Sequence, residues 1–166
     1  GNYTLNWATS TFYYDTYLAG PPENPDSLTM VPGNNSVNDT LAAISGTASD
    51  NSLGGVNNAK WALWRNSDGK YWLDGWLAGP VPANPGSWPD PNQVSPTGGT
   101  PVTWERTTML PNPISDMTDG CTYYVTSVAA DRVVDQDGNY SPNYEVNRTT
   151  ITFWWDISAP VSITTM

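Results

Sequence analysis

Oxygen-bearing side chains gather in one acidic stretch of the chain, residues 131–139. Carboxylate and amide oxygens spaced along a single loop are the ligands that Ca²⁺ takes in proteins. The EF-hand pattern is not met, because Val133 stands where its first acid would be. One interpretation is an optional calcium site that stiffens this loop, with Asp50 and Asp156 completing it from neighbouring loops. The other is that these acids only stabilise turns. The candidate ligands are Asp131, Asp135, Asp137 and Asn139.

Histidine is absent from the chain. Its absence removes Ser-His triads, most zinc sites and the usual general base near neutral pH. Two carboxylates could still act as acid and base on a glycosidic bond, but the acids available for such a pair lie in no motif and are equally typical of turns. We therefore expect no enzymatic activity and no required cofactor. The acids considered are Asp74, Asp90, Glu105 and Asp116.

The elements that would position these residues are short β-strands separated by turn residues. Long helical periodicity is absent, and Asp68-Gly69 has the form of a tight hairpin between two strands. The region 80–99 is too rich in proline for the interior of a sheet. We expect an all-β, two-sheet sandwich of about seven strands, with Trp61 or Trp64 as the buried indole of its central strand. The expected strands are 28–31, 41–48, 59–65, 70–76, 102–108, 122–130 and 149–155.

The strand expected at 122–130 has a clear alternation. Its odd positions, from Tyr123 to Ala129, are suited to a core, whereas Thr126 and Ala130 are expected to face outward. Asp119-Gly120 shortly before Tyr123 is typical of a corner at which a Tyr hydroxyl bonds back to the backbone.

The chain nearly repeats its beginning at its end. Residues 1–4 (GNYT) return as 138–141 (GNYS), and 11–15 (TFYYD) return as 152–156 (TFWWD). The spacing of the first pair is 138 − 1 = 137 residues. Solenoid repeats run to roughly 20 to 50 residues, so a period this long indicates tandem domains.

This repetition predicts a module cut out of phase from a longer array. Residues 1–16 are expected to be the last-strand region of a preceding repeat or a donated strand, and 17–27 a Pro-rich connector. Residues 28–157 form the module, and 158–166 the first strand of the next repeat. We expect 1–16 to pack on a neighbour while 149–155 completes the sheet. The strand residues assigned to assembly are Thr11, Phe12, Tyr13, Tyr14, Val161 and Ile163.

An ordered set of short segments carries a resemblance. The segments are Gly46-Thr47-Ala48-Ser49-Asp50, the hairpin 69–76, Ala129-Ala130-Asp131 and Asp156-Ile157-Ser158-Ala159-Pro160. In this order they resemble the bacterial and archaeal immunoglobulin-like tandem repeat domains of large cell-surface or extracellular fibre proteins. The resemblance implies an immunoglobulin-like sandwich that serves as a structural spacer, without catalysis, at the cell surface or outside the cell.

The composition of the chain limits the kinds of partner that it is expected to bind. The net charge is −10 with only 6 basic residues, which argues against binding to nucleic acid or to anionic membranes. No apolar run approaches the ~20 residues that span a bilayer, so no membrane insertion is expected. Cys121 is the single cysteine, and we expect it to be a small buried thiol. Candidate glycosylation sequons, which support an extracellular glycoprotein, begin at Asn2, Asn34, Asn38, Asn139 and Asn147.

Nine Trp and nine Tyr exceed what one small core requires. Exposed indoles in or beside the Pro-rich region could stack on sugars, which would make the module a carbohydrate-binding adhesin. The other interpretation, which the repetition favours, is that these rings bury contacts between copies of the module, as expected for a structural unit of an extracellular filament or surface stalk. The indoles considered for carbohydrate are Trp76, Trp88 and Trp104.

Overall fold

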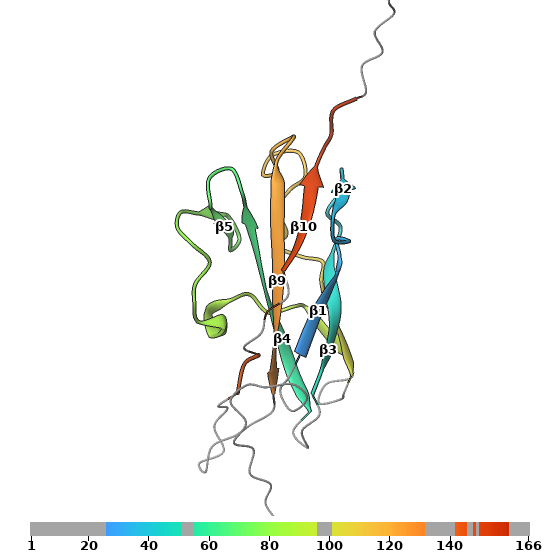
Figure 1. The fold of residues 1–166 in the computed structure, drawn as a ribbon, viewed down its shortest axis with the longest axis vertical. Coiled ribbons are helices and arrows are strands. Elements are labelled where there is room, and N and C mark those ends of the chain that lie inside the picture. The colour runs from blue at the N-terminus through green and yellow to red at the C-terminus, as the bar shows by residue number, and fades with distance from the viewer. Residues whose placement is uncertain are drawn as a thin grey trace, which may run out of the picture.

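The computed structural model describes residues 26–50, 55–95, 101–131, 142–145, 148 and 150–159. These residues form two β-sheets and one 3₁₀ turn, with the long strands running along the length of the molecule (Figure 1). The residues assigned to assembly at 11–14 and 161–163, and residues 17–25 of the predicted connector, lie outside the described residues, whereas connector residues 26 and 27 belong to the first strand. In chain order the elements are β1 (Asp26–Val31), β2 (Ser36–Asn38), β3 (Ile44–Ser49), β4 (Val56–Arg65), β5 (Tyr71–Trp72), β6 (Trp76–Leu77), η1 (Pro85–Ser87), β7 (Gln93–Ser95), β8 (Val102–Arg106), β9 (Thr122–Asp131) and β10 (Thr150–Trp155).

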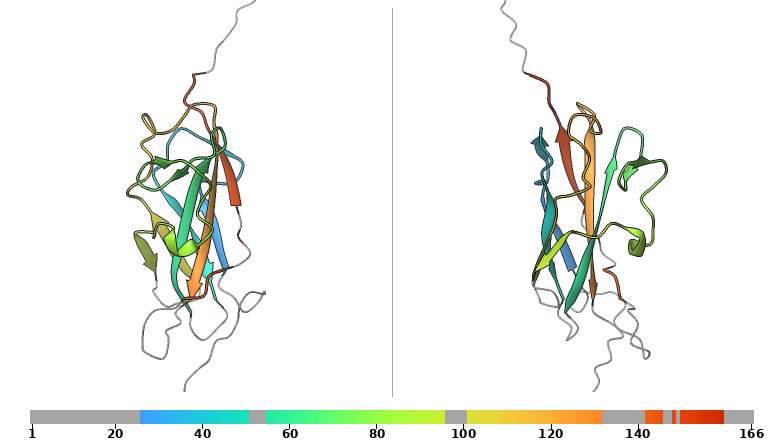
Figure 2. Two further views of the ribbon diagram at one scale, coloured as in Figure 1. Left: turned by 90° about the vertical axis from the view of Figure 1, so that its left-hand side faces the viewer. Right: turned by 180° about the vertical axis from the view of Figure 1, so that it is seen from behind.

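The two sheets have the strand order of an immunoglobulin-like sandwich. One sheet has the order β1-β3-β8-β7 and the other the order β2-β10-β9-β4-β5-β6. Named by position, they are the A-B-E-D sheet and the sheet containing C, F and G of that fold. All pairings are antiparallel except the parallel pairing of β2 with β10. Figure 2 shows the sheets as two layers, so the predicted fold is confirmed.

Several predicted boundaries change in the structure. The strand expected at 70–76 is two short strands, β5 and β6, because residues 73–75 turn the chain back, with Asp74 at a positive φ of 54°. The region 80–99 was expected to be too rich in proline for the interior of a sheet, and it contributes only the short edge strand β7. Residues 150–155 complete the larger sheet between β9 and β2, as expected.

The core lies between the sheets and is built on aromatic rings. The largest fully buried side chains include Trp61 of β4, Trp104 of β8, Tyr123 of β9 and Trp155 of β10. Trp61 is thus the buried indole of the central strand, and Trp64 points to the other face of the sheet. Burying a ring of this size contributes about 3 kcal/mol or more from area alone. Cys121 is only half-buried, at the margin of this core.

The corner before β9 is confirmed. The backbone N–H of Thr118 donates to the hydroxyl of Tyr123 at 2.7 Å. Gly120, at a φ of 71°, provides the left-handed conformation that the turn needs, and its N–H donates to the carbonyl of Trp155. The corner therefore joins the start of β9 to the end of β10.

The outer face of the larger sheet is covered over the part that contains Thr126, Val128 and Ala130 of β9. Thr126 and Ala130 were expected to face outward into solvent, but both are buried. The Pro-rich insertion folds back and packs Trp88 against Ala62 and Val128, and Tyr144, which bridges to Ala130, packs beside them in this second small core. The N–H of Trp61 donates to the carbonyl of Pro89 at 3.2 Å, so the insertion also covers the edge of β4.

Candidate functional site

The three indoles considered for sugar binding lie in three different places. Trp104 is 1 % exposed in the main core, and Trp88 is 4 % exposed under the insertion. The prediction of exposed indoles is therefore wrong for these two rings, because each fills the space between packed elements. The indole N–H of Trp88 donates to the carbonyl of Pro82, and Arg148 stacks over its ring at 4.8 Å.

Trp76 is half-buried and serves the fold. Its indole N–H donates to the carbonyl of Asp116 at 2.6 Å, and its ring meets Trp72 edge to face at 5.2 Å. The guanidinium of Arg65 covers the ring at 4.8 Å from its centre. With Arg65 on the ring, Trp76 has little free face for a sugar. The three indoles do not form a common platform.

Of the four candidate calcium ligands, only Asp131 is described. Its carboxylate accepts two hydrogen bonds from Asn143, from the backbone N–H at 2.8 Å and from the side-chain amide at 2.7 Å. Asp135, Asp137 and Asn139 lie outside the described residues. Within the described part of the chain, no group of three or more His, Cys, Asp or Glu side chains could hold a metal ion.

Asp50 and Asp156 cannot complete one site together. Asp156 follows β10, whose Trp154 pairs with Thr122 at the start of β9. Asp50 precedes β4, whose first residue, Val56, pairs with Asp131 at the far end of β9. The two acids therefore lie at opposite ends of the sandwich, which corrects the expectation that they meet.

The acids considered for catalysis lie on four different segments, with Asp74 on the 73–75 turn, and two of them take structural roles. Asp90 anchors the insertion, because its carboxylate contacts Asn58 and forms an ion pair with Lys60 at 2.7 Å. Asp116 accepts a hydrogen bond from the N–H of Asn112, four residues earlier, at 2.8 Å. Glu105 lines a shallow depression of about 340 Å³ on the outer face of the smaller sheet, where it is the one acid among the lining residues. No two of these acids line that depression together.

Two of the five sequons fall on described residues. Asn34 is exposed, and its side-chain carbonyl accepts the N–H of Thr152 at 3.0 Å. Asn38 is half-buried, and its side-chain N–H donates to the hydroxyl of Ser36 at 2.7 Å. Asn34 is thus the more accessible acceptor of the two. Asn2, Asn139 and Asn147 lie outside the described residues.

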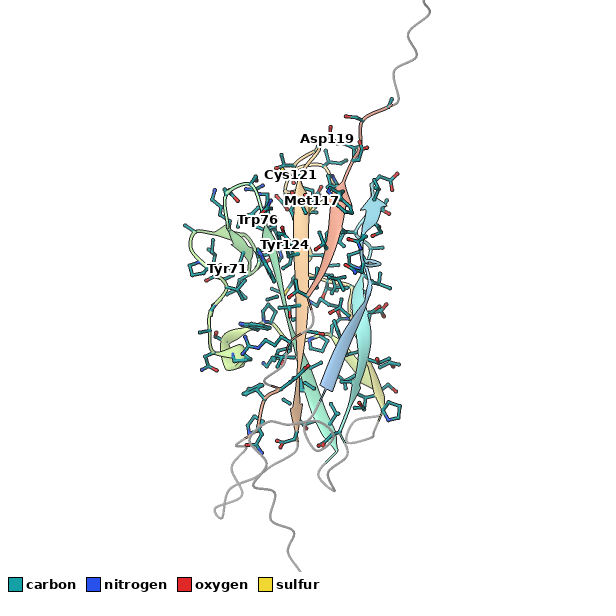
Figure 3. All side chains as sticks on the ribbon, viewed as in Figure 1. Tyr71, Trp76, Met117, Asp119, Cys121 and Tyr124 are labelled. Atoms are coloured by element: carbon teal, nitrogen blue, oxygen red, sulfur yellow. The ribbon has the colours of Figure 1, made fainter. Side chains whose placement is uncertain are left out.

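The end of the sandwich at which β10 finishes holds three exposed apolar side chains, among them the most exposed large apolar residue of the described part of the chain. We call this end the exit pole, and it comprises the loop 107–121 and the segment 156–159. Ile114 is 89 % exposed, and Met109 and Ile157 are each 54 % exposed. Figure 3 shows Asp119 at this pole, with Met117 and Cys121 below it at the start of β9.

Hydrogen bonds from the body of the fold hold the loop of the exit pole. The indole N–H of Trp72 donates to the carbonyl of Met109 at 2.7 Å, and Met109 has a positive φ of 54°. The side chain of Asn112 accepts the N–H of Ile114 at 2.9 Å, which forms the turn that carries Ile114. Arg65 on β4 donates to the hydroxyl of Thr118 at 2.9 Å.

Asp119 fastens the chain where it leaves the sandwich. One carboxylate oxygen accepts the N–H of Ile157 at 2.8 Å, and the other accepts the hydroxyl of Ser158. These bonds, that of Ser158 first, hold the pKa of Asp119 below its usual range. Nearby, the guanidinium of Arg65 lowers the pKa of Asp68 well below its usual range. Both carboxylates are at the surface, so solvent weakens these charge interactions.

An aromatic row on the larger sheet also escaped prediction. Trp64 and Tyr124 are cross-strand partners, and their rings stack with centres 5.4 Å apart. Tyr71 pairs with Trp64 on the next strand, so the row spans three strands. The alternation of β4 and β9 carried the signal for this row. The exit pole offered a weaker signal, namely an isolated Ile114 directly after the segment Pro111-Asn112-Pro113.

Comparisons of the chain with protein-family models, with curated proteins and with solved structures found no match. Among the residues that the structure describes, no helix has the length and apolar character needed to cross a membrane.

Proposed function

We propose that this chain is a structural repeat unit of an extracellular filament or cell-surface stalk, in which copies follow one another head to tail. The observation that carries the proposal is the second copy of the last strand. In β10, Phe153 and Trp155 are buried in the core, whereas Trp154 is 39 % exposed. The five residues 152–156 have the sequence TFWWD, and residues 11–15 have the sequence TFYYD.

The earlier copy has the same alternation of core and surface positions. Phe12 and Tyr14 correspond to the two buried rings of β10, and Tyr13 corresponds to Trp154. In the described sandwich, β10 occupies the place between β9 and β2. A second strand with the same pattern is therefore suited to the same place in a second sandwich, as in an array of tandem modules.

A chimera tests this assignment. Residues 26–137 are joined directly to Gly1 of the whole chain, so that the first sandwich can be completed only by residues 11–14. We expect two folded sandwiches, seen as two sets of dispersed amide resonances in an NMR spectrum. Phe12→Asp should unfold the first sandwich alone, because it places a charge at a core position. Tyr13→Asp, the matched control at an outward position, should leave both folded.

The opposite pattern would contradict the proposal. If the first sandwich stays unfolded, or folds equally well with Phe12→Asp, residues 11–14 do not play the part of β10. Assembly itself is tested by electron microscopy of protein that spans three or more repeats. A beaded fibre with one bead per module is expected, since head-to-tail contacts that do not close into a ring extend into a fibre. Isolated globules would argue against a filament.

A further inference from the structure

The exit pole combines a loop that hydrogen bonds hold in place with apolar side chains that are exposed. Its loop is held in place by indole hydrogen bonds from Trp72 and Trp76, yet it presents Ile114 almost entirely to solvent. Met109 is likewise exposed, on a backbone held at a positive φ, which costs free energy in a residue other than glycine. An apolar side chain presented by a well-fastened loop is typical of a contact surface.

The course of the chain indicates what covers this surface. β10 ends at Trp155, and the next residues leave the sandwich at the exit pole, where Figure 1 shows the chain continuing away from β10. Asp119 fastens Ile157 and Ser158 to the loop 107–121, so the departing chain is held against the same loop that carries Ile114 and Met109. Any module that follows along the chain must begin at this pole.

We infer that the exit pole is the seat of the next repeat, which covers Met109, Ile114 and Ile157, and that Asp119 is the positioning residue that aims the chain toward it. This inference rests on the proposed function, because its occupant is a following copy of the same module. The contact makes the junction stiff. Interfaces between neighbouring domains are otherwise small and permit relative motion unless they bury apolar surface.

The test uses a two-repeat protein made of the whole chain followed by residues 31–157. In it, residues 161–166 supply the first strand of the second sandwich. The readout is the rate at which hydrogen peroxide oxidises Met109, followed by mass spectrometry of the peptides. Met117 is buried in the same loop and serves as the internal reference. We expect Met109 to react about tenfold more slowly in the two-repeat protein than in the single chain, which corresponds to a modest contact free energy.

Two variants test the hydrogen bonds by which Asp119 holds Ile157 and Ser158, which we call the clamp. Asp119→Ala in the two-repeat protein should return the oxidation of Met109 to the rate of the single chain, because the departing segment is released. Ser158→Ala removes only the hydroxyl donor and should restore part of that rate. Asp74→Asn removes an exposed acid on the 73–75 turn while keeping a residue that tolerates its positive φ; it is the control and should have no effect.

The results also distinguish this inference from the proposed function. If both sandwiches fold and Met109 reacts equally fast in the single and two-repeat proteins, the seat does not exist, while the tandem repeat stands. If Met109 is protected but Asp119→Ala leaves the protection unchanged, Asp119 is not the positioning residue. If the second sandwich does not fold on residues 161–166, the inference and the repeat assignment both fail.

Discussion

Replacing Trp88 by alanine should release the Pro-rich insertion while leaving the sandwich folded. Trp88 packs on Ala62 and Val128 in a small core separate from the main one, and its indole N–H donates to Pro82. A buried Trp side chain covers about 200 Å², which at about 25 cal/mol per Å² is about 5 kcal/mol. The ordering of the insertion opposes this gain, so we expect a loss of about 3 kcal/mol.

Hydrogen exchange at one amide reports the release directly. The N–H of Trp61 donates to the carbonyl of Pro89, so its protection depends on the closed insertion. A loss of about 3 kcal/mol should speed its exchange about a hundredfold if the opening is local. Amides paired between β9 and β10 should keep their rates. Trp154→Ala, which removes an exposed indole, is the matched control and should leave the Trp61 amide unchanged.

Two outcomes would refute this reasoning. An unchanged Trp61 amide would show that the insertion does not need Trp88. Equal acceleration of amides throughout both sheets would show that the insertion and the sandwich unfold as one unit.

Two further predictions concern the corner and the exit pole. Tyr123→Phe leaves the N–H of Thr118 without its partner and should lower the free energy of unfolding by about 1 to 3 kcal/mol, measured by urea denaturation; a loss below 0.5 kcal/mol would mean that water replaces the hydroxyl. The hydrogen bonds that Asp119 accepts lower its pKa in the folded protein. The stability that they contribute is therefore present above about pH 4, the ordinary pKa of Asp. It is lost as the pH falls through the lower pKa of the folded state. An NMR titration of the Ile157 amide should show this step below pH 4, and Asp119→Asn should abolish it; a midpoint at or above pH 4 would contradict the clamp.

The β-sandwich could be predicted because its signals are local. Turn residues bounded the strands, and alternation along residues 122–130 identified Tyr123 as a core residue, which the structure confirms. The corner was also accessible, since Asp119-Gly120 and Tyr123 lie within five residues of one another. Each of these signals depends on neighbours in sequence.

The candidate sites were harder to predict, because they depend on which distant segments meet. The sequence marks Trp88 only as a Trp in a Pro-rich loop, and nothing local shows that the loop returns to cover Ala62 and Val128. Asp119 reaches Ile157 across 38 residues of chain, so the corner motif predicted the turn and missed the clamp. Asp50 and Asp156 were expected to meet from neighbouring loops, but the strands that these loops follow end at opposite ends of the sandwich.

The parallel pairing of β2 with β10 has a mechanical consequence. A chain pulled from its two ends draws β1 and β2 toward the N-terminal side and β10 toward the C-terminal side. Because β2 and β10 lie side by side and run in the same direction, their bonds, including Asn35 N–H to Thr152 and Asp156 N–H to Asn38, bear the load together in shear. Strands pulled apart from one end would instead lose their bonds one at a time. Single-molecule pulling should therefore show one abrupt rupture per module. The rupture force should fall in Asn34→Ala, which removes a hydrogen bond between the two segments. A gradual extension would exclude the shear geometry.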